Sequence, residues 1–397
     1  MSSGRPCLRA RLAGLASTLR EQARWRALRC WEPLGPVQAR VEGRAQVLFC
    51  GNDYLGLATH PALRDAAVAA IGRCGVGAGS AHLVTGHGPE HAALEEEVAE
   101  WLGRPRALLF GSGYLANLGI LQALLGPGDL CVQDKLNHAC LLDGARLSGA
   151  LLRRYPHADV EAAARQLATR REACAVLATD GVFSMDGDIA PLAELAALCR
   201  REGALLVVDD AHGAGVLGEQ GRGTAAMLGL PAEAVDLQLV TLGKAFGAYG
   251  AVVAGDATLV EALLQRARSY LFTTALPPAV AAAARAALRL IRGEEGARRR
   301  ERLAALTARF RRGAEQLGLP LRPSPTPIQP LVLGADARAV AASAALARRG
   351  FAVAAIRPPT VPEGQARLRI TLSAEHRADQ VDALLEALHE VVREVAA

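Results

Sequence analysis

The sequence has few aromatic residues, no long apolar run and no strong charge of either sign. Aromatic residues make up 4% of the 397 residues, while hydrophobic residues make up 51%, so we expect a large core built mainly from Ala, Leu and Val. The formal net charge of +5 is small for this length, and no basic stretch is interleaved with aromatic residues, which argues against a nucleic-acid partner. No apolar stretch is long enough to span a bilayer, which argues against a membrane partner.

Cysteine is present without a pattern, because the eight cysteines are scattered and form no CxxC pair. In a chain of this length, such spacing favours reduced thiols in a cytoplasmic protein over a disulfide framework. Residues 5–20 are rich in Arg and free of acidic residues, as mitochondrial presequences are. We prefer an amphipathic first helix over Leu8–Arg29, because Glu21 and Gln22 continue its periodicity.

Lysine is the scarcest basic residue: of the 45 Lys and Arg residues, only Lys135 and Lys244 are lysines. Arg supplies charge but stays protonated, whereas a desolvated lysine can lose its proton and attack a carbonyl carbon. Lys244 stands in Thr241–Gly247 (TLGKAFG), at the end of an apolar run that predicts a buried strand, Leu237–Leu242. For a Gly-Lys pair alone, a surface lysine in a loop would be the ordinary interpretation.

A second apolar run, Leu205–Val208, ends in two carboxylates, Asp209 and Asp210, and His212 follows. In α/β proteins, ligands bind at the carboxyl ends of parallel strands. Pyridoxal phosphate needs a lysine partner and an acidic group beside its ring nitrogen. Taken singly, Asp209 could cap a helix and His212 could be an ordinary loop histidine, but together with Lys244 they predict a pyridoxal phosphate site.

Apolar runs alternate with helical patterns through the middle of the chain, which predicts an α/β fold with a mostly parallel sheet covered on both faces. The strands expected in this region are Ala107–Phe110, Leu130–Gln133, Ala175–Thr179, Leu205–Val208, Leu237–Leu242 and Ala251–Ala254, and Val47–Asn52 is expected to form a separate strand before them. An Ala-rich helical stretch, Ala279–Leu317, and a Pro-rich segment, Pro320–Pro330, lead into a smaller α+β unit. We expect an N-terminal helix and arm over 1–50, a large cofactor-binding domain over 51–285 and a small C-terminal domain over 286–397.

Three further motifs have two interpretations each. Gly111–Tyr114 follows a predicted strand and opens a helix, where free N–H groups can bind phosphate, although a plain turn would look the same. His82, His87 and His91 cluster as metal ligands can, but neither a Cys nor a third carboxylate ligand accompanies them at a standard spacing, so we expect no metal site. Arg357, which precedes two prolines, suits either a substrate carboxylate or a surface turn.

Together these stretches resemble the α-oxoamine synthases, a family of pyridoxal phosphate enzymes of fold type I. The resemblance covers almost the whole chain and is carried by NDYLGL (52–57), HLVTG (82–86), GSGYLAN (111–117), VFSMDGD (182–188), VDDAHG (208–213), GEQGRG (218–223), TLGKAFG (241–247) and RPPTVP (357–362). It implies a large domain with a mostly parallel seven-stranded sheet and a smaller α+β C-terminal domain. His82 departs from the pattern, since relatives often have Arg there.

Within the family, FSMDGDIAPL and AIRPPTVPEGQARLRITLS are most similar to the branch that makes 8-amino-7-oxononanoate in biotin biosynthesis. This implies a pyridoxal phosphate-dependent acyltransferase that joins L-alanine to a pimeloyl thioester of acyl carrier protein or CoA. Glycine C-acetyltransferase or 5-aminolevulinate synthase chemistry, on glycine and a short acyl-CoA, is the alternative. A non-catalytic pyridoxal phosphate sensor is a further one, which the lack of a helix-turn-helix candidate disfavours.

The resemblance also implies residue roles. Lys244 would bind the cofactor covalently, Asp209 would pair with its ring nitrogen, and His138 would stack on its ring. His212 and Ser184 would contact the ring substituents. The phosphate would be held by Gly113, Tyr114 and Thr241, and by Thr273 and Thr274 of a second copy, so a homodimer is expected. Arg357 would bind the amino-acid carboxylate, and Arg29, Asn52 and Thr360 would line the acyl-substrate side.

Overall fold

A computed structural model describes residues 7–395, and the contacts within the chain divide it into two compact units. The large unit is residues 52–303, and the small unit combines the residues before 52 with those from 304 onward. The N-terminal segment therefore groups with the C-terminal residues. Residue 285 lies inside helix α11 (Pro278–Arg292), which packs on α2 (Pro61–Cys74) and α3 (Pro89–Leu102) and so stays in the large unit.

The large unit contains a seven-stranded sheet with the strand order β4-β10-β9-β8-β7-β5-β6. Its strands are β4 (Arg106–Phe110), β5 (Leu130–Asp134), β6 (Leu151–Tyr155), β7 (Ala175–Asp180), β8 (Leu205–Asp209), β9 (Leu237–Thr241) and β10 (Ala251–Gly255). Pairs from β9 through β6 are parallel, whereas β10 runs antiparallel to both of its neighbours. The predicted α/β class with a mostly parallel sheet is thereby confirmed.

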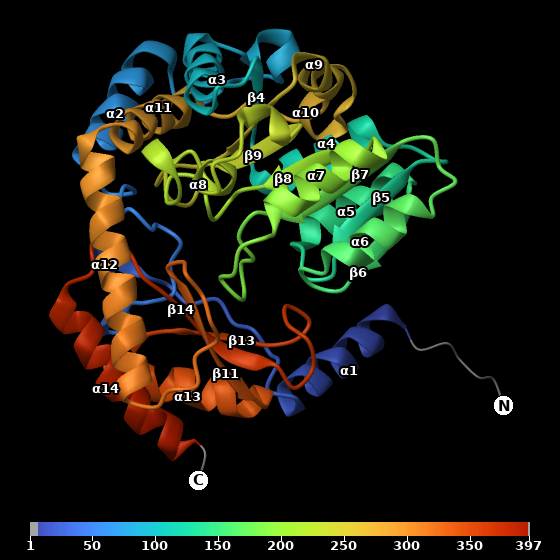
Figure 1. Cartoon of the computed structure of the whole chain (residues 1–397). Helices are drawn as coiled ribbons and strands as arrows, with labels where there is room; N and C mark the ends of the chain where they lie inside the picture. The colour runs from blue at the N-terminus through green and yellow to red at the C-terminus, as the bar shows by residue number, and fades with distance from the viewer. Residues whose placement is uncertain (1–6, 396–397) are drawn as a thin grey trace. The chain divides into compact units, whose positions relative to one another are not determined.

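Helices cover both faces of this sheet (Figure 1). On β8, Val207 belongs to one apolar cluster while Leu206 and Val208 belong to the other, as the alternation of side chains along a strand requires. One cluster includes residues of α4 (Gly113–Leu124), α5 (Ala139–Ser148), α9 (Ala257–Arg266) and α10 (Arg268–Leu271). The other includes residues of α6 (Val160–Ala168) and α7 (Leu192–Glu202). Each fully buried Leu or Val of this core contributes about 1.5–3 kcal/mol.

Shorter helical segments complete the large unit. They are a π-helical turn (His82–Gly86), two 3₁₀ turns (Glu219–Gly221 and Ala232–Ala234) and α8 (Thr224–Met227). Helix α12 (Glu294–Gln316) follows α11 after Gly293 and crosses the division at residue 303.

The small unit contains two sheets. The first has the order β1-β2-β3-β12, with β12 parallel to β3, and the second has the antiparallel order β11-β14-β13. Their strands are β1 (Glu32–Gly35), β2 (Gln38–Val41), β3 (Arg44–Leu48), β11 (Ile328–Gly334), β12 (Phe351–Ala352), β13 (Ala354–Ile356) and β14 (Ala366–Thr371). Its helices besides the end of α12 are α1 (Leu8–Glu21), α13 (Asp336–Arg348) and α14 (Ala378–Glu394).

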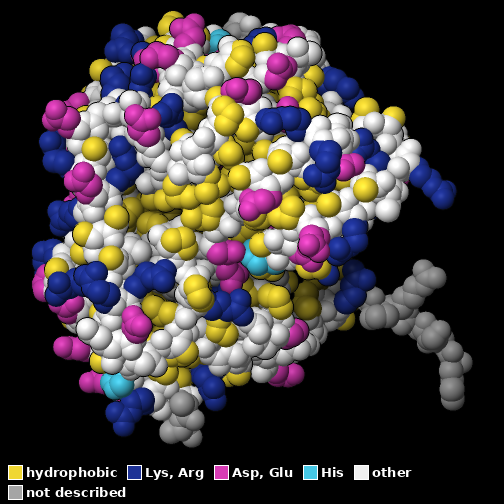
Figure 2. Space-filling model, in the orientation of Figure 1, with side chains coloured by type: hydrophobic (Ala, Val, Ile, Leu, Met, Phe, Trp, Pro, Cys, Tyr) yellow, Lys and Arg dark blue, Asp and Glu magenta, His cyan; other side chains and the backbone are white. Residues whose placement is uncertain are grey.

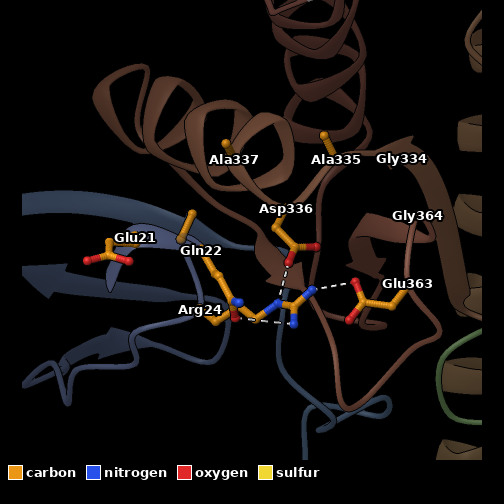
Figure 3. Close-up of a pocket in the computed structure, with 10 residues that line it drawn as sticks. Glu21, Gln22, Arg24, Gly334, Ala335, Asp336, Ala337, Glu363 and Gly364 are labelled. Carbon is orange, nitrogen blue, oxygen red and sulfur yellow. Dashed lines mark hydrogen bonds and ion pairs between the residues drawn. The ribbon is translucent and has the colours of Figure 1, made fainter. Parts of the chain in front are cut away.

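Helix α1 ends at Glu21, so the prediction that it runs to Arg29 is wrong for its second part. Ala23 has φ of +55°, a left-handed conformation that does not continue a right-handed helix. The next residue, Arg24, is held by acidic side chains of the same unit: its Nε lies 2.6 Å from Asp336 Oδ2, and it also pairs with Glu363 (Figure 3). These residues line a hollow of about 620 Å³. The backbone N–H groups of Arg24 and Trp25 also donate to the Leu19 carbonyl, so hydrogen bonds to the last turn of α1 and ion pairs together hold this segment.

Across residues 7–395, no helix combines the length and the apolar composition that crossing a membrane would require. On the face drawn in Figure 2, basic and acidic side chains are interspersed. All eight cysteines lie in the described part of the chain and are free thiols.

Candidate active site

Lys244 and His212 lie together beyond the ends of β9 and β8. Lys244 Nζ is 2.8 Å from His212 Nε2, and His212 Nδ1 is 2.7 Å from the hydroxyl of Tyr54. His212 is buried and Lys244 is partly buried. The arrangement follows from the sheet, because neighbouring parallel strands deliver the residues that follow them to the same edge. A hydrogen-bonded row of three side chains therefore holds the lysine amine in place.

Asp209 is the last residue of β8 and faces the same edge. Its Oδ1 accepts a hydrogen bond from the Ala211 N–H (3.1 Å), and its Oδ2 accepts one from the Asn117 side-chain amide (2.6 Å). The adjacent Asp210 has another environment, since it accepts hydrogen bonds from Thr224 N and Oγ1 and from Gln238. Burial raises the pKa of Asp210 to about 7. Asp209 is therefore the carboxylate at the site, whereas Asp210 stabilises the neighbouring turn through its hydrogen bonds to Thr224 and Gln238.

His138 lies at the start of α5, just after β5. Its backbone N–H donates to Asp180 Oδ2 (3.0 Å), and its ring meets that of Tyr114 edge-on, with 6.5 Å between centroids. Asp180 ends β7 and pairs in register with Asp209. Burial first, and then the charge of Asp209, raises the pKa of Asp180 well above its usual value. Partial desolvation lowers the pKa of His138.

The start of α4 packs against the end of β9. Ser112 caps the helix through the Leu115 N–H, and a Cβ added to Gly113 would lie 2.8 Å from Thr241 Cγ2. Only glycine fits there without displacing Thr241. Because the first N–H groups of a helix have no partner within it, this close-packed helix start suits an anion such as phosphate.

His157 anchors the loop that contains Ser184 through a hydrogen bond to Asp188. The His157 ring bridges Asp134 (3.1 Å), the last residue of β5, and Asp188 (2.7 Å), in the loop after β7. Burial alone would lower the pKa of His157, but the hydrogen bonds to the two aspartates outweigh it and raise the pKa to about 10. Ser184 itself is partly buried.

The other expected residues of the large unit lie in two places. Asn52 accepts a hydrogen bond from the Tyr54 hydroxyl (3.3 Å), which connects it to the His212 and Lys244 row. Thr273 and Thr274 follow α10, and Thr274 pairs with Ala81 in an isolated β-bridge. Thr274 is exposed and Thr273 is partly buried.

The small unit brings two expected substrate residues together. Arg29 and Arg357 line one cavity of about 740 Å³, whose wall also includes the aromatic rings of Trp25 and Trp31. The Nε of Arg357 is buried without a hydrogen-bond partner, and burial followed by the charge of Arg26 lowers the pKa of Arg357. A carboxylate would satisfy this guanidinium. Thr360 is exposed in the turn after Arg357 and does not line the cavity.

The three clustered histidines of the large unit make hydrogen bonds and ring contacts within the protein. His91 Nδ1 accepts the Gly88 N–H, and its Nε2 bonds to the Leu276 carbonyl. His82 Nδ1 lies 3.0 Å from His87 Nδ1, and the His82 ring stacks on Tyr270. Within the described part of the chain, no group of three or more His, Cys, Asp or Glu side chains is arranged to hold a metal ion.

Three residues at the site had no role in the sequence-based prediction: Tyr54, Asn117 and Asp180. Tyr54 and Asn117 stand inside motifs that were recognised, NDYLGL and GSGYLAN. Asn117 follows Gly113 by four positions, which places both on one face of α4, and this spacing was the available signal. Asp180 directly follows the predicted strand Ala175–Thr179 and lies beside Asp209 in the sheet, so strand order was needed to find it.

These residues fit pyridoxal phosphate. The helix start at Gly113 suits the phosphate, the Asp209 carboxylate suits a protonated ring nitrogen, and the Lys244 amine suits the aldehyde carbon. All three come from the carboxyl-end edge of one sheet, where fold type I enzymes of the resembled family would hold the cofactor.

Comparisons with known proteins support the same assignment. A family model described as aminotransferase class I and II matches residues 44–388. The chain is 56% identical to an 8-amino-7-oxononanoate synthase of Methylococcus capsulatus over 95% of this chain and 96% of that one. It is 54% identical to the 8-amino-7-oxononanoate synthase of Xylella fastidiosa strain M12 over 97% and 96% of the two chains.

Solved structures agree on the fold. A variant of serine palmitoyltransferase from S. paucimobilis, with a bound PLP–myriocin aldimine, has a TM-score of 0.93, 29% identity and coverage of 99% of this chain and 100% of that one. An 8-amino-7-oxononanoate synthase from Francisella tularensis has a TM-score of 0.77, 32% identity and coverage of 89% and 99%. The cofactor is pyridoxal 5'-phosphate, and the chain belongs to the α-oxoamine synthases, pyridoxal phosphate-dependent acyltransferases of fold type I.

Proposed function

We propose that the chain joins L-alanine to a pimeloyl thioester and releases 8-amino-7-oxononanoate, CO₂ and the free thiol, as a step of biotin biosynthesis. A bond forms between the alanine α-carbon and the thioester carbonyl carbon, the thiol leaves, and the alanine carboxyl group departs as CO₂. The observation that carries the proposal is the 54–56% identity to 8-amino-7-oxononanoate synthases over more than nine-tenths of both chains.

When bound, pyridoxal phosphate supplies an electron sink for the negative charge left at the α-carbon when its proton is removed. Lys244 would bind the cofactor and, once alanine replaces it, take the α-proton as general base. The contact with His212, backed by Tyr54, keeps the amine in position between these tasks.

The remaining cofactor contacts are assigned to the sheet edge. Asp209 would keep the ring nitrogen protonated, His212 and Ser184 would contact the ring substituents, and His138 would stack on the ring. Gly113, Tyr114 and Thr241 would hold the phosphate. Thr273 and Thr274 would reach the phosphate of a second copy, which makes the proposed enzyme a homodimer.

The remaining proposed roles are contacts with the two substrates. Arg357 would bind the alanine carboxylate, which suits its buried Nε without a hydrogen-bond partner. Arg29, Asn52 and Thr360 would line the acyl-substrate side. The thiol carrier of the pimeloyl group is acyl carrier protein or CoA.

Absorbance titration of the cofactor-loaded protein tests the proposal. L-Alanine should change the cofactor spectrum at lower concentration than glycine or L-serine, and a pimeloyl thioester should then start CO₂ release. A preference for glycine with a short acyl-CoA would replace the proposal with acetyltransferase or 5-aminolevulinate synthase chemistry. Binding of cofactor with no response to any amino acid would contradict a catalytic role.

A further inference from the structure

Cys140 lies between two side chains of the site, on the first turn of α5. Its Sγ is 2.8 Å from His138 Nδ1 and 3.0 Å from the side-chain nitrogen of Asn117. The same Asn117 nitrogen is 2.6 Å from Asp209 Oδ2. Cys140 and Asn117 therefore connect the histidine and the carboxylate proposed to contact the cofactor ring.

The directions of these hydrogen bonds follow from their donors. The backbone N–H of Cys140 donates to His138 Nδ1 (3.3 Å), so Nδ1 carries a lone pair and the ring proton is on Nε2. The Cys140 S–H can then donate to the same Nδ1, while Sγ accepts an N–H of Asn117. Since the Asn117 amide has two N–H groups, the other one can serve Asp209.

The protonation states agree with this assignment. Burial, followed by the negative charge of Asp209, raises the pKa of Cys140, so its sulfur keeps the proton that it donates. Partial desolvation lowers the pKa of His138, which keeps the ring neutral near pH 7 and its Nδ1 able to accept.

Burial leaves Cys140 and Asn117 no substitute partner, whereas His138 itself is exposed. Asn117 is fully buried and Cys140 is 2% exposed, so water does not reach the sulfur to replace a lost contact. The Asn117 side-chain oxygen is itself buried without a hydrogen-bond partner. The amide is thus held in place by its two donor contacts, to Cys140 and Asp209.

We propose that Cys140 is a positioning residue for His138, which fixes the tautomer and rotation of its ring and couples them through Asn117 to Asp209. The inference rests on the cofactor roles proposed above for His138 and Asp209. Cys199, by contrast, packs among apolar residues on the opposite face of the sheet.

Three variants separate this role from simple packing. Cys140→Ala removes both sulfur contacts. Cys140→Ser keeps a group that donates to His138 and accepts from Asn117. Cys199→Ala removes another sulfur that is 2% exposed, and so matches the packing loss without touching the site.

The direct readout is ¹⁵N NMR of the histidine rings in the full-length protein, with and without pyridoxal phosphate. Wild type, Cys140→Ser and Cys199→Ala should show an unprotonated Nδ1 on His138 at pH 8. In Cys140→Ala only the 3.3 Å contact from the backbone N–H of residue 140 is left to keep Nδ1 unprotonated. Some of the tautomer with its proton on Nδ1 should therefore appear, and the pKa of His138 should rise, because a donor to its neutral form is gone. Pyridoxal phosphate should bind about tenfold more weakly to Cys140→Ala alone, the loss expected of one buried hydrogen bond.

A wild-type His138 with its proton on Nδ1 would overturn the proposal without any variant. So would a Cys140→Ala protein whose His138 tautomer, pKa and cofactor affinity all match those of Cys199→Ala. Neither readout uses alanine or a thioester, so failure of the proposed condensation would show separately, as missing turnover in a protein whose His138 still depends on Cys140.

Discussion

Lys244 Nζ lies 2.8 Å from His212 Nε2, although the two residues are 32 positions apart in the sequence. They meet because β8 and β9 are adjacent parallel strands whose following loops share one edge of the sheet. The partner on the far side of His212 is the Tyr54 hydroxyl, so the orientation of the lysine amine depends on a tyrosine from another part of the large unit.

Replacement of Tyr54 with Phe tests that dependence. The variant keeps the buried ring and loses the hydroxyl that contacts His212 Nδ1, a hydrogen bond of about 1 kcal/mol. We expect kcat/KM for alanine to fall roughly fivefold with little change in thermal stability. Tyr249→Phe, at an exposed position, is the matched control. Equal rates in the two variants would show that the Tyr54 hydroxyl does not help to orient the lysine amine.

Replacement of Asp209 with Asn tests the ring-nitrogen assignment. The amide oxygen still accepts from Asn117, so the fold is retained, but the charge that would keep the cofactor nitrogen protonated is lost. We expect cofactor binding to persist and turnover to fall roughly 10- to 100-fold, as loss of a charge-assisted hydrogen bond implies. Wild-type turnover in a variant that binds pyridoxal phosphate would refute the assignment.

The close packing of Gly113 against Thr241 gives a third prediction. In Gly113→Ala the new Cβ meets Thr241 Cγ2 at 2.8 Å, so the helix start or the threonine must shift. We expect weaker binding of pyridoxal phosphate, measured by absorbance titration. Adding Thr241→Ser removes the methyl group and keeps the hydroxyl, so the double variant should recover affinity for pyridoxal phosphate. No recovery would show that the contact with the Thr241 methyl group does not cause the weaker binding.

The His157 bridge predicts a pH-dependent contribution to stability. Its pKa in the folded protein, about 10, is above the ordinary value for histidine, so the stabilisation is complete below about pH 6.5 and is lost as the pH rises toward 10. We expect His157→Gln to lower the free energy of unfolding by about 1–3 kcal/mol at pH 6. Denaturation at pH 6 and pH 10 measures this, and a difference between variant and wild type that does not shrink at pH 10 would show that the charge is not responsible.

The strands of the large sheet were predictable where apolar runs are bounded by turns. The predicted runs at 107–110, 130–133, 175–179, 205–208, 237–242 and 251–254 coincide with strands to within one or two residues. Strand β6 was missed because it is an edge strand whose sequence, LLRRY, carries two arginines that face partly outward. The reversed direction of β10 follows from its short connection to β9, which holds no crossover helix.

The small unit was harder to predict, because its two sheets combine segments far apart in the sequence. Strand β12, from residue 351, pairs with β3 near residue 47, and no local pattern specifies such a partner. Likewise, α1 ends at Glu21, and Arg24 just beyond it pairs with Asp336, a residue far away in the sequence. Periodicity alone extends that helix further.

The residues of the site were predictable when they stood at strand ends or in recognised motifs. Lys244, Asp209 and His212 meet this condition, and the structure places all three at one edge of the sheet. Cys140 and Asp180 became identifiable only from their contacts with His138 and their place beside Asp209, since a buried thiol or carboxylate has no distinguishing local pattern.

Because lysine is scarce in this chain, the assignment of Lys244 as the residue that binds pyridoxal phosphate can be measured directly. The chain has two lysines, and Lys135 is exposed in the loop after β5. Reduction of the cofactor-loaded protein with borohydride, followed by peptide mass spectrometry, identifies the lysine that binds pyridoxal phosphate. We predict a cofactor adduct on the Lys244 peptide, none on the Lys135 peptide, and no adduct in Lys244→Ala. An adduct on Lys135, or cofactor bound with neither lysine modified, would contradict the assignment of this site.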